Sequence, residues 1–298
     1  MKHYISFTIF FDAVDFPVSL GTLLRFIAML GRGSGASKSA RNVISSIKWF
    51  TSFIHPPSLK VFESVMVSSS IRGLDALLSR PPRQKLPFTL KHLCSFYNLL
   101  SLDDPKQLAS WCAMLLSFFA CFRLSNLVPH SKSNFDPLKH LQRDDIRFEG
   151  SVLLVFYKWS KTNQCSRKVS WIPICSVDDP RFNIKFYFNK LFTLVNAPGN
   201  APLFSFARKD FHSRYSLVRS LDSCVFRAGL TPADYIWHSF RRGAAVFAFE
   251  LGLPDSAVQL FGDWSSAAFK NYLEFALLRK ISIAESVAKS FDKEVKLI

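Results

Sequence analysis

The chain has 298 residues, of which 49% are hydrophobic and 15% aromatic, a composition that favours packed globular structure and excludes a disordered chain. A formal net charge of +16 makes a polyanion the expected partner, either a phosphate backbone or an acidic membrane surface. The longest apolar run, residues 111–122, is about half the length that a transmembrane helix requires. The charge therefore favours nucleic acid, and we expect no membrane association. Residues 1–12 lack the apolar core and cleavage site of a secretory signal.

The region from residue 16 to about residue 79 is predicted to form three or four short helices. Apolar residues recur at helical spacing in its middle, at Val43, Ile44, Ile47, Phe50 and Ile54. The segment R-P-P-R-Q-K-L-P at 80–87 follows, and its prolines disfavour both helix and sheet. We interpret this segment as a linker and divide the chain into domains 1–82 and 83–298.

The next predicted element is a strongly apolar helix. Asp104 followed by Pro105 is a typical helix start, and the apolar run continues through Phe122. The sequence thus predicts that Arg123 ends this helix. A cation in that position either serves a site or complements the carboxyl end of the helix.

Residues 145–174 change to the period of β-strands. β-Branched and aromatic runs alternate with the turn segments E-G and K-T-N-Q-C-S, which predicts a small antiparallel sheet. Lys161 falls in the turn between the last two strands. A lysine at a hairpin tip either solubilises the turn or can be lowered onto a ligand.

Helical patterns return from about residue 181 and lead to the stretch from Trp237 to Tyr272. His238 and Arg241 lie one helical turn apart, so a proton-transfer group stands beside a fork of donors suited to phosphate oxygens. Trp264 and Tyr272 follow eight residues apart. The alternative is an ordinary buried helix with a satisfied histidine and a surface arginine. Beyond Tyr272, residues 277–291 carry an amphipathic stripe that is expected to fold back or to dock on a neighbour.

Cysteines and paired acids give no sign of a metal or a cofactor. The six cysteines, Cys94, Cys112, Cys121, Cys165, Cys175 and Cys224, include no C-x-x-C pair, so we expect free thiols in a reducing compartment. The paired acids, Asp103 with Asp104, Asp144 with Asp145 and Asp178 with Asp179, all lie at expected caps or turns. A two-metal nuclease built from these acids is the weaker alternative.

Six residues that bear on phosphate chemistry occur in one order: Arg123, Lys161, His238, Arg241, Trp264 and Tyr272. This order resembles the catalytic signature of the tyrosine recombinases, or phage-integrase family: an Arg ending a hydrophobic helix, a hairpin Lys, H-x-x-R, a His or Trp, and a Tyr nucleophile. The segments F-R-L-S-N-L-V-P, Y-K-W-S-K-T, H-S-F-R-R-G and W-S-S-A-A-F-K-N-Y are most similar to eukaryotic mobile-element members of the Crypton and DIRS type. The resemblance covers residues 87–275, and the N-terminal part only by architecture.

The resemblance implies a mainly α fold. Residues 1–82 would form a small helical core-binding domain of SAM-like type, and residues 83–298 an α+β catalytic domain with a small antiparallel sheet. It also implies a site-specific recombinase or integrase that cleaves and rejoins double-stranded DNA through a 3′-phosphotyrosine intermediate. Such enzymes assemble as tetramers on DNA, and a eukaryotic member would be nuclear.

The implied roles agree with the chemistry of the residue types. Two arginines, Arg123 and Arg241, can neutralise the non-bridging phosphate oxygens. Tyr272 would be the nucleophile, although an unperturbed tyrosine has a pKa of about 10 and requires a positive field and a base. His238 is the candidate acid or base, and Lys161 would protonate the departing 5′ oxygen. Trp264 can donate its indole N–H to a phosphate oxygen.

Two features depart from the family pattern. The spacing from Trp264 to Tyr272 is one residue shorter than in many bacterial members. Asn126, three residues after Arg123, stands where many members carry an acid, and an amide supplies no charge. Asn126 keeps open the alternative of a non-catalytic DNA-binding protein derived from such a recombinase. An enzyme similar to type IB topoisomerases, which shares the chemistry, is the other alternative.

Overall fold

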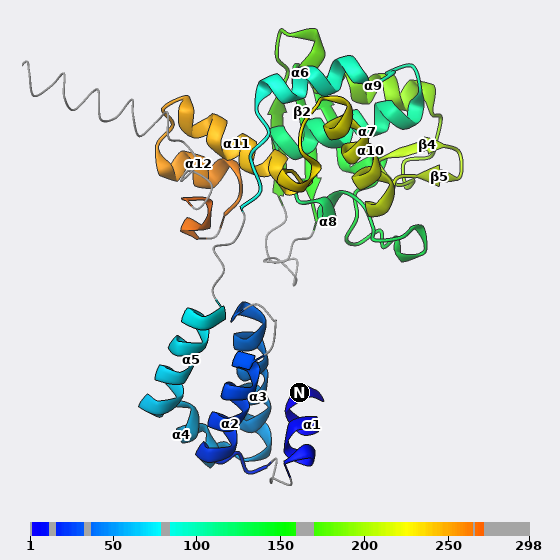
Figure 1. Cartoon of the computed structure of the whole chain (residues 1–298). Helices are drawn as coiled ribbons and strands as arrows, with labels where there is room; N and C mark the ends of the chain where they lie inside the picture. Colours follow the sequence, from blue (N-terminus) through cyan, green and yellow to red (C-terminus); the bar gives the residue numbers. More distant parts are fainter. Residues whose placement is uncertain are drawn as a thin grey trace, which may run out of the picture. The chain divides into compact units, whose positions relative to one another are not determined.

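The computed structural model describes residues 2–11, 16–32, 37–78, 84–158, 170–264 and 266–270. The chain divides into two compact units, residues 1–83 and 84–298, and each unit has its own buried apolar core (Figure 1). We call them unit 1 and unit 2.

Unit 1 is helical throughout its described part. Its helices are α1 (Lys2–Phe10), α2 (Leu20–Arg32), α3 (Ser37–Ile54), α4 (Leu59–Phe62) and α5 (Val65–Leu78), with a 3-10 turn η1 (Pro56–Ser58) before α4. Helix α2 buries Leu23, Phe26 and Ile27, three positions on one face, and packs mainly against α5. Ile44 and Ile47 of the predicted α3 stripe are also buried, whereas Ile54 is half exposed. The predicted series of short helices is thus confirmed.

Unit 2 contains seven α-helices, five strands and five short 3-10 turns in its described part. The helices are α6 (Leu90–Leu99), α7 (Pro105–Phe119), α8 (Leu124–Leu127), α9 (Ile184–Leu194), α10 (Arg214–Arg227), α11 (His238–Glu250) and α12 (Asp255–Phe261). The 3-10 turns are η2 (Lys132–Asn134), η3 (Arg143–Asp145), η4 (Pro180–Phe182), η5 (Pro232–Asp234) and η6 (Ala267–Phe269). No helix in the described ranges is long and apolar enough to cross a membrane.

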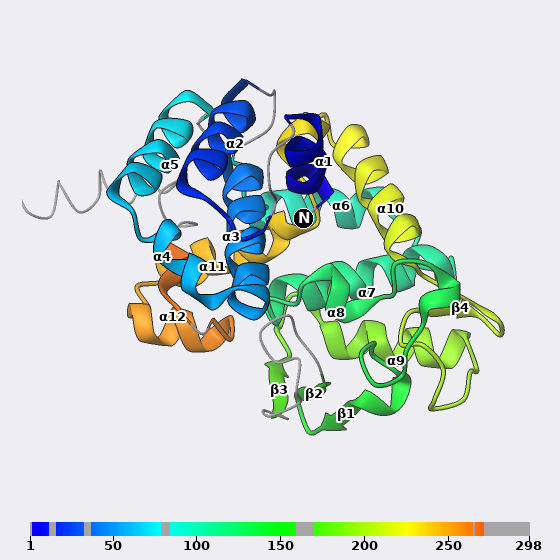
Figure 2. The ribbon, with the colours of Figure 1, turned by 90° about the horizontal axis from the view of Figure 1, so that it is seen from below.

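Helix α7 is the centre of unit 2. Asp104 caps it by accepting a hydrogen bond from the backbone N–H of Lys106 at 3.0 Å, and Pro105 occupies the first turn, as predicted. Every residue from Leu108 to Phe118 is buried, because α9, α10 and α11 all pack against α7 (Figure 2). A helix that is apolar on all sides must be covered by other elements on every side.

The predicted antiparallel sheet is present beside this helical core. Its strands β1 (Ile146–Glu149), β2 (Val152–Tyr157) and β3 (Ser170–Cys175) lie in the order β1-β2-β3. In register, Val155 of β2 pairs with Ile146 on one side and Ile172 on the other. Alternate residues of β2 are buried, which is the pattern of a sheet with one face on a core. A second, two-stranded ribbon of β4 (Ser205–Ala207) and β5 (Asp210–Phe211) was not predicted, because strands this short show no period.

Candidate active site

Arg123 begins a short helix; it does not end a long one. Helix α7 stops at Phe119, and Cys121 has a φ of 53°, a left-handed conformation that turns the chain. Arg123 then takes an extended conformation as the residue before α8, and its carbonyl accepts the backbone N–H of Asn126 at 2.8 Å. The prediction that Arg123 terminates the apolar helix was therefore wrong. The reversal at Cys121 was not visible in a continuous apolar run.

His238 is the first residue of α11, so the predicted helix start is confirmed. The preceding residue, Trp237, is buried, and its indole N–H donates to the hydroxyl of Ser117 in α7 at 2.8 Å. This bond fixes the amino end of α11 against the central helix. His238 and Arg241 consequently leave α11 one turn apart, at a position set by the core of unit 2.

A pocket of about 370 Å³ brings Arg123 and His238 together. Residues from three elements line it: Arg123, Leu124 and Ser125 at α8, Arg214, Val218, Leu221 and Asp222 of α10, and Ile236, Trp237 and His238 at the start of α11. The pocket thus combines two arginines, a histidine and a hydroxyl, which are groups that bind phosphate oxygens.

His238 carries no positive charge at neutral pH. Burial, followed by the positive charges of Arg241, Arg123 and Arg242, lowers the pKa of His238 to about 4. A neutral imidazole has one nitrogen that can accept a proton, so His238 at neutral pH is in the protonation state that can act as a base. The same result shows that the charge of Arg241 acts at the pocket.

Arg241 itself is buried, with 4% of its surface exposed. Its guanidinium donates to the carbonyl of Cys121 and, at 2.7 Å, to the carbonyl of Gly262. The ring of Trp264 covers it, with 4.2 Å from the guanidinium carbon to the ring centroid. Gly262 leaves room for this ring, because a Cβ at that position would overlap it. Trp264 therefore packs directly on Arg241, a contact that the sequence did not predict.

The remaining two predicted site residues, Lys161 and Tyr272, lie outside the described residues. Their roles stay predictions. The neighbouring Lys158 is engaged in the structure: its ammonium pairs with Asp145 at 2.6 Å and donates to Gln142 at 2.9 Å. Lys158 thus ties the end of β2 to η3.

Arg214, Ser125 and Asp222 are pocket residues that sequence reasoning missed. Ser213 caps α10 and so places Arg214 in its first turn, where anions are favoured. The serine cap that places Arg214 in a first turn can be recognised in the sequence. The sequence gave no indication that the first turn of α10 lies beside α8, because the two elements are about 90 residues apart.

The paired acids have structural partners. Asp103 pairs with Lys190 at 2.7 Å and Asp179 with Arg181 at 2.6 Å, besides the pair of Asp145 with Lys158. Among the described residues, no group of three or more His, Cys, Asp or Glu is placed to hold a metal ion. The five described cysteines, Cys94, Cys112, Cys121, Cys175 and Cys224, are free thiols.

No protein-family model matches the sequence, and no curated protein matches it. Solved structures do match. The Tn1549 transposon integrase in complex with a circular intermediate DNA aligns with a TM-score of 0.60 over 91% of this chain and 86% of its own, at 14% identity. The fold is that of the tyrosine recombinases.

Two further tyrosine recombinases are similar in fold. The XerH site-specific recombinase bound to a palindromic difH substrate has a TM-score of 0.54 over 93% of this chain and 75% of its own, at 12% identity. A lambda integrase dimer bound to a COC′ core site has a TM-score of 0.52 over 91% of this chain and 70% of its own, at 15% identity. The predicted fold class is thus confirmed. The finer resemblance to Crypton and DIRS-type elements stays a prediction.

Proposed function

We propose that this protein is a site-specific DNA recombinase that cleaves and rejoins DNA through a 3′-phosphotyrosine intermediate on Tyr272. The observation that carries the proposal is the pocket in which Arg123 and His238 meet, with the charge of Arg241 behind it, inside a tyrosine-recombinase fold. Duplex DNA is the proposed partner, in agreement with the net charge of +16.

In the proposed cleavage step, the phenolic oxygen of Tyr272 attacks the phosphorus of one phosphodiester. A bond from that oxygen to phosphorus forms, and the bond from phosphorus to the 5′ oxygen breaks. The phenolic proton passes to His238, whose lowered pKa keeps the imidazole neutral at neutral pH. Lys161 gives a proton to the departing 5′ oxygen. Arg123 and Arg241 stabilise the charge on the non-bridging oxygens.

Rejoining is the same step in reverse. The 5′ hydroxyl of another strand attacks the phosphotyrosine, the bond to Tyr272 breaks, and the proton returns to the phenolic oxygen. The ester bond is retained throughout, so strand exchange requires no external energy source. We infer that four copies act together, because recombination cuts two duplexes at two positions each, and that the amphipathic stripe at residues 277–291 links them.

A specific observation favours the second candidate, a DNA-binding protein that does not cleave. Asn126 is buried at 3% exposure next to the pocket, and it supplies an amide where many family members supply a carboxylate. A buried carboxylate would orient and balance the pocket arginines, whereas an amide contributes no charge. A protein of this second kind would bind DNA but would not cleave it.

The test is covalent capture of DNA. We would incubate the purified full chain with a pool of nicked duplexes of randomised sequence, so that the short fragment between the cleavage site and the nick, which carries the new 5′ hydroxyl, diffuses away and rejoining is blocked. Denaturing electrophoresis then shows a protein band carrying labelled DNA. The expected result is a band for the wild-type chain that is absent for Tyr272→Phe, because phenylalanine has no oxygen to bond phosphorus.

Tyr157→Phe is the matched control, since this tyrosine belongs to β2 and should leave the band unchanged. No band despite tight binding to the pool would contradict the proposal and favour the non-catalytic protein. Relaxation of supercoiled DNA in the same preparation would indicate the topoisomerase alternative.

A further inference from the structure

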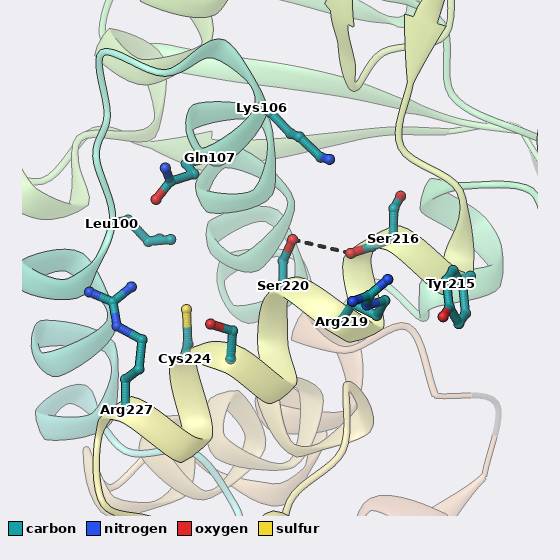
Figure 3. A pocket seen from close by; sticks show the side chains of 10 residues that line it. Leu100, Lys106, Gln107, Tyr215, Ser216, Arg219, Ser220, Cys224 and Arg227 are labelled. Atoms are coloured by element: carbon teal, nitrogen blue, oxygen red, sulfur yellow. Dashed lines mark hydrogen bonds between the residues drawn. The ribbon is translucent and has the colours of Figure 1, made fainter.

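A second cleft, of about 490 Å³, lies on the other side of α10 from the candidate active site. Val218, Leu221 and Asp222 of α10 face the active-site pocket. The residues of α10 that face the second cleft fall on the opposite half of the helix at 100° per residue, and the cleft is closed by Leu100, Lys106 and Gln107 from the end of α6 and the start of α7 (Figure 3).

The second cleft is strongly cationic. Lys106, Arg219 and Arg227 line it, and the lining residues include no carboxylate. The side chains of Arg219 and Arg227 form neither a hydrogen bond nor an ion pair with any residue that the structure describes. Arginines left in this state are available to an anion from outside the chain.

These cations form an ordered row together with an aromatic ring. Tyr215, Arg219, Ser223 and Arg227 recur every four residues along α10, so their side chains follow one another along one side of the helix. The two arginines are eight residues and therefore about 12 Å apart along the axis. The ring of Tyr215 is 68% exposed, and the guanidinium of Arg219 lies 5.6 Å from its centroid.

Hydrogen bonds of His212 connect the wall behind the row to both helices. His212 is fully buried, and its Nδ1 lies 3.0 Å from the hydroxyl of Ser216 in the cleft wall. Its other nitrogen reaches the carbonyl of Lys106 at 2.9 Å and the hydroxyl of Ser110 at 3.1 Å. This network joins the first turns of α7 and α10, which form the two sides of the cleft.

The volume of the cleft indicates which kind of anion can bind in it. A volume of this order holds a group of the size of a nucleotide and is too small for the body of a duplex. A cationic row that follows a backbone, with an exposed aromatic ring for a base, is the combination that binds single strands. A separate single-stranded segment arises in the proposed reaction, because cleavage releases a strand with a free 5′ hydroxyl.

We propose that the cleft between α10 and the α6–α7 turn binds single-stranded DNA, with its phosphates on Arg219, Arg227 and Lys106 and one base on the ring of Tyr215. The proposal rests on the proposed function for its source of single strands, but binding itself requires no cleavage. The two sites lie on opposite faces of α10 and therefore hold different parts of the DNA.

The test is fluorescence anisotropy of a labelled oligothymidylate of twelve nucleotides, titrated with the full chain at a fixed salt concentration. We expect the double variant Arg219→Gln, Arg227→Gln to bind it at least roughly tenfold more weakly, and its affinity to fall less steeply with salt. Tyr215→Ala should weaken binding several-fold, while Tyr215→Phe, which keeps the ring, should bind as the wild type does.

Arg147→Gln is the matched control, since Arg147 is another exposed arginine stacked on an aromatic ring, that of Trp171 at 4.3 Å. It should leave oligothymidylate binding unchanged. Unchanged binding by the double variant would overturn the proposal, and so would an equal loss of affinity for a twelve-base-pair duplex. Displacement of the oligonucleotide by millimolar inorganic phosphate alone would also overturn it, by indicating a simple anion site. Covalent capture at Tyr272 is measured separately, so either proposal can fail without the other.

Discussion

Burial is the largest cause of the lowered pKa values of two histidines of unit 2, His212 and His238. Burial alone accounts for most of the lowering at His212, whose pKa is about 4. At His238 the charges of Arg241, Arg123 and Arg242 add to burial and bring the pKa to the same value. An anion bound in the active-site pocket would cancel part of this positive field, whereas it would leave His212 unaffected.

We therefore predict that DNA raises the pKa of His238 and leaves that of His212 near 4. The reason is that a phosphate beside Arg123 removes the penalty on the protonated imidazole. The measurement is an NMR titration of the imidazole resonances of the Tyr272→Phe variant, with and without duplex DNA. An unchanged His238 pKa in saturated complex would contradict the assignment of this pocket to phosphate.

At the scale of elements, the position of α11 depends on one close approach. A Cβ on Gly243 would overlap the backbone carbonyl of Phe88, and the N–H of Phe88 donates to the carbonyl of Ser239 in the first turn of α11 at 3.0 Å. We predict that Gly243→Ala destabilises unit 2 by about 1–3 kcal/mol, because the helix must shift away from this segment. Urea unfolding, followed by circular dichroism, measures the change.

Gly73→Ala in α5 is the control for helix propensity. A Cβ at Gly73 meets no atom within 4 Å, so the substitution should stabilise unit 1 by about 1 kcal/mol. Stabilisation of unit 2 by Gly243→Ala would show that α11 does not depend on the close approach.

Elements were predictable from the sequence where their signal is local. Asp104 and Pro105 predicted the start of α7, and β-branched and aromatic runs between turn segments predicted the sheet, because such signals act within a few residues. The neighbours of the candidate site were not predictable. Arg214 reaches the pocket and Trp264 reaches Arg241 only through packing between distant elements, which no pattern in the sequence records.

At the scale of the whole molecule, two separate cores imply two separate stabilities. Phe26 is fully buried in the core of unit 1 and Phe188 in that of unit 2. We predict two unfolding transitions in calorimetry. Phe26→Ala should lower the temperature of only one transition, and Phe188→Ala that of only the other. Each substitution should reduce the free energy of unfolding of its own unit by about 3–5 kcal/mol. A single transition that both substitutions lower would show that the units fold as one.

Arg242 connects the first residues of unit 2 to helix α11. Its guanidinium donates at 2.5 Å to the carbonyl of Lys85 and to the side chain of Gln84, the first two residues of the unit. Arg242 is also the residue directly after Arg241 on α11. The segment that enters unit 2 is therefore tied to the helix turn that carries Arg241, so a displacement of Gln84 or Lys85 would be passed to the backbone next to the candidate site.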